Sequence, residues 1–209
     1  MMTFYDCATA PSPRRARILL AEKGVAFKTV QIDLRSGEQM SEAYRAINPQ
    51  CTVPALATLE GLVLTDNAAI TAYLEAAYPN PPLLGRTAID KAEIASWNWR
   101  MEFEGLLAIA EALRNSAPAM VNRALPGPTD YAQIPELAAR GLQRVQHFMD
   151  MLDTHLAGRE FIAANQLSIA DITAVVAVDF ARVVRIKPSE QHIHLKRWRE
   201  ALALRPAFA

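Results

Sequence analysis

The chain has 209 residues, and its 22 lysines and arginines are balanced by 22 aspartates and glutamates. Zero net charge gives no broad field to attract nucleic acid or an anionic membrane, so neither is expected as a partner. No apolar run approaches the roughly 20 residues that span a bilayer, and the first residues lack the basic and apolar regions of a signal peptide. These features predict a protein of the cytoplasm.

Cysteine and histidine are scarce in the chain. The two cysteines, Cys7 and Cys51, lie far apart in the sequence, which favours a reducing compartment over a disulfide scaffold. We expect both to be structural. His192 and His194 are two residues apart and would diverge on a helix, with no cysteine nearby. No metal site is therefore expected.

The first eighty residues alternate between strand and helix patterns. The first helix is predicted to end at Gly24, and the turn Glu60–Gly61 separates the strands of a hairpin. This βαβαββα order predicts a four-stranded mixed sheet with helices packed on it. The predicted elements are a strand at 3–6, a helix at 13–23, a strand at 26–32, a short helix at 37–47, strands at 55–58 and 62–64, and a helix at 67–78.

The second half of the chain has a different pattern. A proline-rich linker at 80–86 separates a first domain at 1–79 from a second at 87–209, which contains long amphipathic helices and no convincing strand. The helix predicted at 87–115 is apolar on two faces, so it must cover two surfaces. One surface can be the core of an all-helical domain. The other needs a partner subunit, the first domain or a ligand pocket.

A local signal marks the start of a helix near residue 168. Ser168 is a good N-cap, and Asp171 stands at the third helical position, where its carboxylate can bond the Ser168 backbone. We interpret this pair as a structural capping box that begins the apolar helix 169–181. Loss of the Asp171 carboxylate is expected to cost about 1–2 kcal/mol of stability.

Two short stretches of the first domain point to a binding site. Pro54 follows Val53 at the start of a predicted strand, and a cis peptide bond after a tight turn would explain a proline there. The Val53 backbone would then be free to pair with an extended peptide. Asp66 and Asn67 stand where the last helix of this domain begins, a position that suits an anionic group. Together these features predict a site for a short, charged peptide.

Several stretches carry a family resemblance through their order and spacing: Ser12–Ile18, Asn48–Pro49, Val53–Leu56, Thr65–Ile70, Phe161–Ala163 and Ser168–Ile172. With them the chain resembles the cytosolic glutathione S-transferase family over nearly its whole length, and most of all the bacterial members of the GTT2-like type. The resemblance implies a thioredoxin-like domain that binds glutathione, an all-helical domain that supplies a pocket for the second substrate, and a homodimer.

The family pattern implies roles for residues of the first domain. Pro54 is the cis proline, and the Val53 backbone bonds the cysteinyl part of glutathione. Asp66 and Asn67 hold the γ-glutamyl end, although the family usually has Glu or Gln followed by Ser at these positions. Gln39 is a candidate contact for the glycyl end, and an exposed loop residue is the alternative. Glutathione is therefore the expected co-substrate, with no metal.

The family pattern leaves open how the glutathione thiol is activated. Its usual catalytic serine falls at Ala10, where no hydroxyl is present. Ser12 is the candidate, at a position where other members carry a cysteine or an asparagine, and it is also expected to be the N-cap of a helix with Pro13 at the first helical position. The dipole and free N–H groups of that helix start would favour a thiolate. The alternative is a water held by polar residues of the second domain, for which Asn115 and Ser116 are the candidates.

These features predict a glutathione S-transferase that conjugates the thiolate to a small hydrophobic electrophile. One alternative is a glutathione-dependent peroxidase or disulfide-bond reductase on the same fold. A second is a non-catalytic protein-interaction module, which the vacancy at Ala10 keeps open and the intact peptide-binding stretches oppose. The candidates for the second-substrate pocket all lie in the predicted helical domain: Trp97, Met101, Asn115, Met120 and Phe180.

Overall fold

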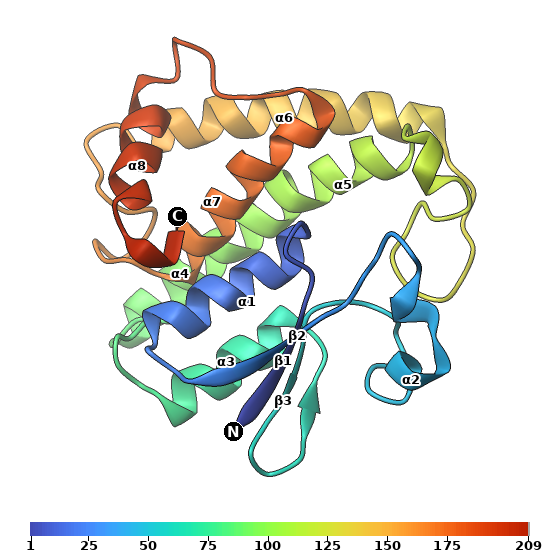
Figure 1. The fold of residues 1–209 in the computed structure, drawn as a ribbon. Helices are drawn as coiled ribbons and strands as arrows, with labels where there is room; N and C mark the ends of the chain where they lie inside the picture. The colour runs from blue at the N-terminus through green and yellow to red at the C-terminus, as the bar shows by residue number, and fades with distance from the viewer. Residues whose placement is uncertain (209) are drawn as a thin grey trace. The chain divides into compact units, whose positions relative to one another are not determined.

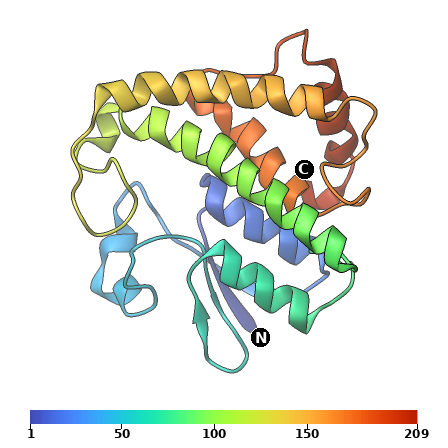
Figure 2. The ribbon, with the colours of Figure 1, turned by 180° about the vertical axis from the view of Figure 1, so that it is seen from behind.

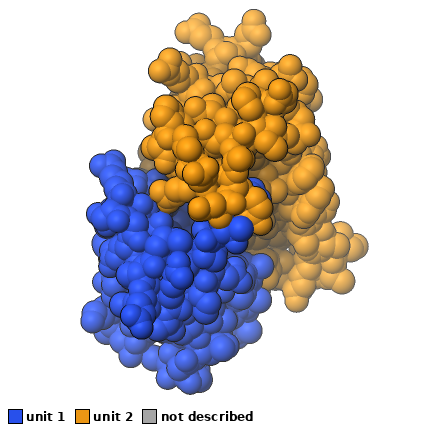
Figure 3. Space-filling view, turned by 90° about the vertical axis from the view of Figure 1, so that its right-hand side faces the viewer, with its two compact units in different colours: residues 1–81, 125–129 blue, residues 82–124, 130–209 orange. Residues whose placement is uncertain are grey.

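A computed structural model of the chain describes residues 1–208. They form two compact units, which Figure 3 shows in different colours. Unit 1 comprises residues 1–81 and 125–129, and unit 2 comprises residues 82–124 and the chain from residue 130 onward. A short piece of the predicted helical domain is therefore part of the first unit. Among the described residues, no helix is both long and apolar enough to cross a bilayer.

Unit 1 is built on the predicted four-stranded mixed sheet (Figure 1). The strands lie in the order β2-β1-β3-β4, with β1 parallel to β2 and β3 antiparallel to β1 and β4. Buried and half-buried residues alternate along β1, as expected for a strand with one face on the core. The thioredoxin-like arrangement predicted from the sequence is confirmed. The strand bounds are β1 Met2–Asp6, β2 Phe27–Gln31, β3 Ala55–Ala57 and β4 Val63–Leu64.

Helices α1 (Pro11–Glu22) and α3 (Asn67–Ala77) lie side by side in unit 1 (Figures 1 and 2). The segment after β2 contains a 3₁₀ helix, η1 (Glu38–Met40), and a short helix, α2 (Glu42–Arg45), where the sequence predicted one helix. The core of the unit is formed by apolar residues of β1, β3, α1 and α3, among them Phe4, Leu56, Ile18, Leu19, Ile70 and Leu74.

The first helix begins earlier than predicted. It starts at Pro11, its N-cap is Ala10 and no side chain caps it, so the prediction that Ser12 is the N-cap was wrong. Prolines occupy the first and third helical positions, and proline tolerates both because the N–H groups there lack helical partners in any case. The sequence pattern was therefore compatible with either start. In the structure the Ala10 N–H bonds the Cys7 carbonyl at 3.0 Å, and the turn that this bond closes leads directly into Pro11.

Unit 2 is helical, as predicted. Helices α4 (Ala88–Arg100) and α5 (Leu107–Arg114) are joined by a π-helical stretch, η2 (Met101–Leu106), so the predicted helix at 87–115 contains a widened turn. Gly105 lies in this turn, where a Cβ atom would come within 2.8 Å of the Phe148 ring, and glycine permits that close packing. The elements that follow are η3 Pro118–Met120, α6 Pro135–His155, α7 Ile169–Phe180, η4 Ala181–Val184, α8 Ile193–Ala203 and η5 Pro206–Phe208.

A buried carboxylate holds the start of α7. One oxygen of Asp171 accepts hydrogen bonds from the Ser168 N–H and the Ser168 hydroxyl, both at 3.0 Å. The other oxygen accepts from the Ile162 N–H at 3.0 Å and from Nε1 of Trp198 at 3.2 Å. Asp171 thus joins the beginning of α7 to the preceding loop and to α8. The sequence indicated the helix start but not these two distant partners.

The burial of Asp171 predicts a pH-dependent stability. Burial raises the pKa of this carboxyl from 3.8 to about 6, against the hydrogen bonds from Ile162, Ser168 and Trp198, which lower it. Between these two values the folded protein retains a proton that the unfolded chain has released. Raising the pH from 3.8 to about 6 should therefore lower the free energy of unfolding, by up to about 3 kcal/mol from this group.

Urea unfolding of the wild type and of Asp171→Asn across this pH range measures the contribution. The variant lacks the titrating group, so its free energy of unfolding should fall less steeply than that of the wild type as the pH rises. Parallel pH profiles for the two proteins would contradict the prediction.

Candidate functional site

The turn before β3 contains a backbone segment with no partner in the protein. The Val53–Pro54 peptide bond is cis, and neither the N–H nor the C=O of Val53 bonds another described residue. Tyr5 pairs with Ala55 across β1 and β3, and continuing this antiparallel register places Val53 opposite Cys7. An extended ligand can therefore pair with Val53 beside the end of β1.

Two buried side chains anchor the residue before Val53. The Tyr44 hydroxyl and the side-chain amide of Asn48 both donate to the Thr52 carbonyl, at 2.7 and 2.8 Å. Burial raises the pKa of Tyr44 to about 12, so its hydroxyl remains a donor at neutral pH. Asn48 is part of the family resemblance seen in the sequence, whereas Tyr44 was not predicted, because a single aromatic in a polar stretch carries no sign of what it bonds.

The start of α1 offers two donors from one residue. Pro11 and Pro13 have no N–H, so Ser12 carries the backbone N–H that the first turn leaves unpaired. The Ser12 hydroxyl oxygen accepts a hydrogen bond from Nδ2 of Asn67 at 2.9 Å, and the same nitrogen donates to the Ser12 carbonyl at 3.2 Å. Because the oxygen accepts from Asn67, the hydroxyl hydrogen is available for a ligand.

Asn67 also places the start of α3 beside the start of α1, because it is the first residue of α3. The preceding residue, Asp66, is the N-cap, and its Oδ1 accepts from the Ala69 N–H at 2.8 Å. No described residue bonds the other carboxylate oxygen of Asp66, and the residue is exposed. The structure therefore brings Ser12, Asn67 and Asp66 together, and one carboxylate oxygen of Asp66 is left free and faces solvent.

Gln39 lies in η1 with 4% of its surface exposed. Its Oε1 atom is buried and has no hydrogen-bond partner among the described residues. The alternative prediction, that Gln39 is an exposed loop residue, was therefore wrong; the 3₁₀ turn directs the residue inward. A buried polar atom without a partner is rare in native structures. Gln39 is consequently suited to complete its hydrogen bonding with a ligand.

The two polar candidates at the end of α5 bond their own unit. The Asn115 amide donates to the Glu111 carbonyl and accepts from the Ile134 N–H, both at 2.9 Å. The Ser116 hydroxyl donates to the Ala112 carbonyl at 2.7 Å. Asn115 is buried and links the end of α5 to the start of α6.

The other candidates of unit 2 are distributed over several elements. Trp97 stacks on His155 with 3.6 Å between ring centroids, and the Arg100 guanidinium lies 4.4 Å from the centre of the Trp97 ring. Met101 is completely buried in η2. Met120 on η3 and Phe180 at the end of α7 are half-buried.

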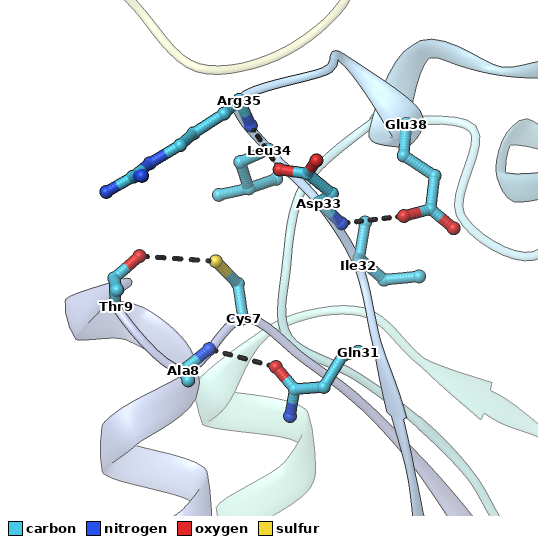
Figure 4. Close-up of a pocket in the computed structure, with 9 residues that line it drawn as sticks. All are labelled: Cys7, Ala8, Thr9, Gln31, Ile32, Asp33, Leu34, Arg35 and Glu38. Atoms are coloured by element: carbon cyan, nitrogen blue, oxygen red, sulfur yellow. Dashed lines mark hydrogen bonds between the residues drawn. The ribbon is translucent and has the colours of Figure 1, made fainter.

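Unit 1 also contains a cavity that the sequence did not indicate. It has a volume of about 340 Å³ and lies where β1 and β2 end (Figure 4). Two segments that are separate in the sequence form the cavity, and the parallel pairing of β1 with β2 brings them together. No local motif could therefore indicate it. Its lining residues are Cys7, Ala8, Thr9, Gln31, Ile32, Asp33, Leu34, Arg35 and Glu38.

Comparison with known proteins identifies relatives along the whole chain. The family model for the glutathione S-transferase N-terminal domain matches residues 9–77, and the model for the C-terminal domain matches residues 117–206. Glutathione S-transferase 2 of Saccharomyces cerevisiae is 32% identical over 209 residues, which cover 99% of this chain and 87% of the relative.

Two solved structures resemble the chain over nearly its whole length. The structure of Gtt2 from Saccharomyces cerevisiae has 31% sequence identity and a TM-score of 0.88, and the match covers 99% of this chain and 98% of that one. A glutathione S-transferase domain-containing protein from Marinobacter aquaeolei VT8 has 30% identity and a TM-score of 0.90, over 99% and 100% of the two chains. The family resemblance inferred from the sequence is thus confirmed, and the chain belongs to the glutathione S-transferase family.

Proposed function

We propose that the protein is a glutathione S-transferase that conjugates glutathione to a small hydrophobic electrophile. The observation that carries the proposal is the Ser12 hydroxyl, which Asn67 holds at the start of α1 with its hydrogen free. Ser12 lies on the segment that follows β1. When the β1–β3 register is continued beyond its last pair, the end of β1 lies opposite the unpaired backbone of Val53. A thiol-containing peptide that pairs with Val53 would therefore present its sulfur near this hydroxyl.

The three parts of glutathione match three kinds of group in unit 1. The free oxygen of Asp66 suits the ammonium of the γ-glutamyl end, and the start of α3 suits its carboxylate. The Val53 backbone suits the cysteinyl amide. The buried and unpartnered Oε1 of Gln39 is an acceptor, which suits the N–H of the glycyl end. In this assignment each ligand group completes a hydrogen bond that the protein leaves open.

Thiolate formation follows from the donors of Ser12. A thiolate accepts hydrogen bonds more strongly than a thiol does, so the Ser12 hydroxyl and its backbone N–H both favour ionisation of the bound sulfur. The positive end of α1 acts in the same direction. We infer that Ser12 activates the sulfur rather than a water held by Asn115 or Ser116, because those side chains already bond the backbone of unit 2.

The reaction is a nucleophilic attack by the glutathione thiolate. The sulfur forms a bond to an electrophilic carbon, and the bond to the leaving group breaks with its electron pair. The proton of the thiol passes to solvent when the thiolate forms. We propose that Trp97, Met101, Asn115, Met120 and Phe180 supply the helical part of the second-substrate pocket.

Two alternative functions make different chemical demands. A peroxidase or disulfide-bond reductase on this fold would use the same thiolate against a hydroperoxide or a mixed disulfide. Both cysteines of the chain are buried and free, so the sulfur of glutathione itself would have to react. A non-catalytic interaction module would require no free donor at Ser12. We therefore favour conjugation.

We also propose a homodimer in the cytoplasm. Trp99, Phe103 and Leu107 follow one another at four-residue intervals on α4, η2 and α5, with 59%, 44% and 54% of their surfaces exposed. The rings of Trp99 and Phe103 stack with 4.9 Å between centroids. An exposed apolar stripe of this kind suits a protein interface, and the family resemblance implies a second copy. The free cysteines suit a reducing compartment.

The Ser12 assignment predicts the properties of the bound thiol. In Ser12→Ala the pKa of the glutathione thiol bound to the protein should rise by about one unit, and kcat/KM for conjugation should fall by roughly tenfold to a hundredfold. Ultraviolet titration of the thiolate measures the first quantity, and initial rates with 1-chloro-2,4-dinitrobenzene measure the second. Ser96→Ala, an exposed serine on α4, is the matched control. An unchanged thiol pKa, or a loss of rate in Ser116→Ala instead, would contradict the assignment.

The stripe predicts a change in oligomeric state. Replacing Trp99 and Phe103 by glutamate should weaken self-association by about a hundredfold or more, because two central aromatic contacts are lost and two charges are buried. Sedimentation equilibrium of the wild type and the double variant measures the change. Ile89→Glu alters an exposed residue elsewhere on α4 and serves as the control. A monomeric wild type, or a double variant of unchanged mass, would exclude this surface.

A further inference from the structure

The cavity of unit 1 lies between the loop that follows β1 and the segment that follows β2 (Figure 4). Its volume of about 340 Å³ falls within the range of small-molecule sites, roughly 300–1,000 Å³. The apolar part of its wall is formed by Cys7, Ala8, Ile32 and Leu34. A space of this size and character can take a substituted aromatic ring.

Three side chains that line the cavity accept hydrogen bonds from backbone N–H groups of its walls. Glu38 accepts from the Asp33 N–H at 2.6 Å, and Asp33 accepts from the Arg35 N–H at 2.9 Å. The bond from the Arg35 backbone is the main cause that lowers the pKa of Asp33. On the other wall, Gln31 accepts from the Ala8 N–H at 3.1 Å. These acceptors therefore already have protein partners.

The Arg35 guanidinium differs from these groups. Arg35 is exposed, and its guanidinium has no hydrogen bond or ion pair with any described residue, although Asp33 is close enough to interact with its charge. In Figure 4 its side chain extends toward the side on which Thr9 lies, while the Glu38 carboxylate points to the opposite side. A guanidinium with free N–H groups binds a carboxylate through two parallel hydrogen bonds.

The cavity and Ser12 belong to the same stretch of chain, which leads from β1 into α1. Thr9 lines it and Ser12 follows three residues later, after the turn that the Ala10 N–H closes on the Cys7 carbonyl. β1 stands between β2 and β3 in the sheet. The cavity therefore occupies the β2 side of the β1–α1 loop, and the Val53 backbone occupies the β3 side.

We propose that this cavity holds the electrophile and that Arg35 selects electrophiles that carry a carboxylate on a small aromatic ring. The inference rests on the proposed function and deepens it, because it names the class of the second substrate. The ring lies against the apolar wall, and the carboxylate pairs with Arg35 at the mouth. For a chloroaryl carboxylate, the glutathione thiolate forms a carbon–sulfur bond and chloride leaves with the electron pair of the broken carbon–chlorine bond.

A matched pair of electrophiles tests the selectivity. 4-Chloro-3,5-dinitrobenzoate and the corresponding benzamide have the same ring and leaving group and differ in charge. The wild type should favour the benzoate, measured as kcat/KM above the spontaneous rate. In Arg35→Gln the benzoate-to-benzamide ratio should fall about tenfold, the loss of roughly one charge-assisted hydrogen bond. Lys28→Gln removes the same charge from an exposed position of β2 that does not line the cavity, and should leave the ratio unchanged.

Binding without turnover separates this inference from the proposed function. Equilibrium binding of the unreactive 3,5-dinitrobenzoate should weaken about tenfold in Arg35→Gln, and Ala8→Phe, which fills the cavity, should weaken binding of the benzoate and the benzamide alike. That pattern supports the site even if no conjugation occurs, in which case the proposed function alone fails. Failure of the wild type to bind 3,5-dinitrobenzoate overturns the inference. A raised KM for glutathione in Arg35→Gln with an unchanged benzoate-to-benzamide ratio also overturns it, because that result would assign Arg35 to glutathione.

Discussion

The hydrogen bonds from Asn67 to Ser12 organise the whole candidate site. They join residues 55 positions apart in the chain and bring the starts of α1 and α3 together. The positive ends of two helices thereby face one region, which favours the negative charges of a thiolate and a carboxylate. The same bonds orient the Ser12 hydroxyl, because its oxygen accepts from Asn67 and its hydrogen is left for a ligand. In the function that we propose, recognition and activation of glutathione both depend on this one side-chain amide.

The other half of the site depends on the turn before β3, which two buried side chains hold in place. Tyr44 and Asn48 are buried and direct their donors at the Thr52 carbonyl, so the next residue, Val53, has a defined position without using its own backbone groups. A free N–H and C=O on a fixed turn bind an extended peptide with little loss of conformational entropy. Because the side chains bond Thr52, the turn is fixed while the backbone groups of Val53 stay free for a ligand.

In unit 2 the comparable anchor is Asp171. Its carboxylate satisfies donors from the start of α7, the preceding loop and α8, so one buried charge fixes three segments. Unit 1 leaves polar groups open at Val53, Asp66 and Gln39, whereas Asp171 has all of its partners inside the protein. This contrast distinguishes a structural polar cluster from one that is suited to a ligand.

The sequence by itself was enough to determine the strands, most of the helices and the family, because alternating and helical periodicities, prolines and capping residues act over a few neighbouring positions. It also indicated Val53, Pro54, Asp66 and Asn67. Only the tertiary structure decided that α1 begins at Pro11 rather than Pro13, that Gln39 is buried, and that residues 125–129 belong to unit 1. The cavity beside Arg35 likewise required the pairing of β1 with β2. Each of these features depends on contacts between residues far apart in the chain, and a local pattern carries no information about which distant group will satisfy a hydrogen bond or cover a side chain.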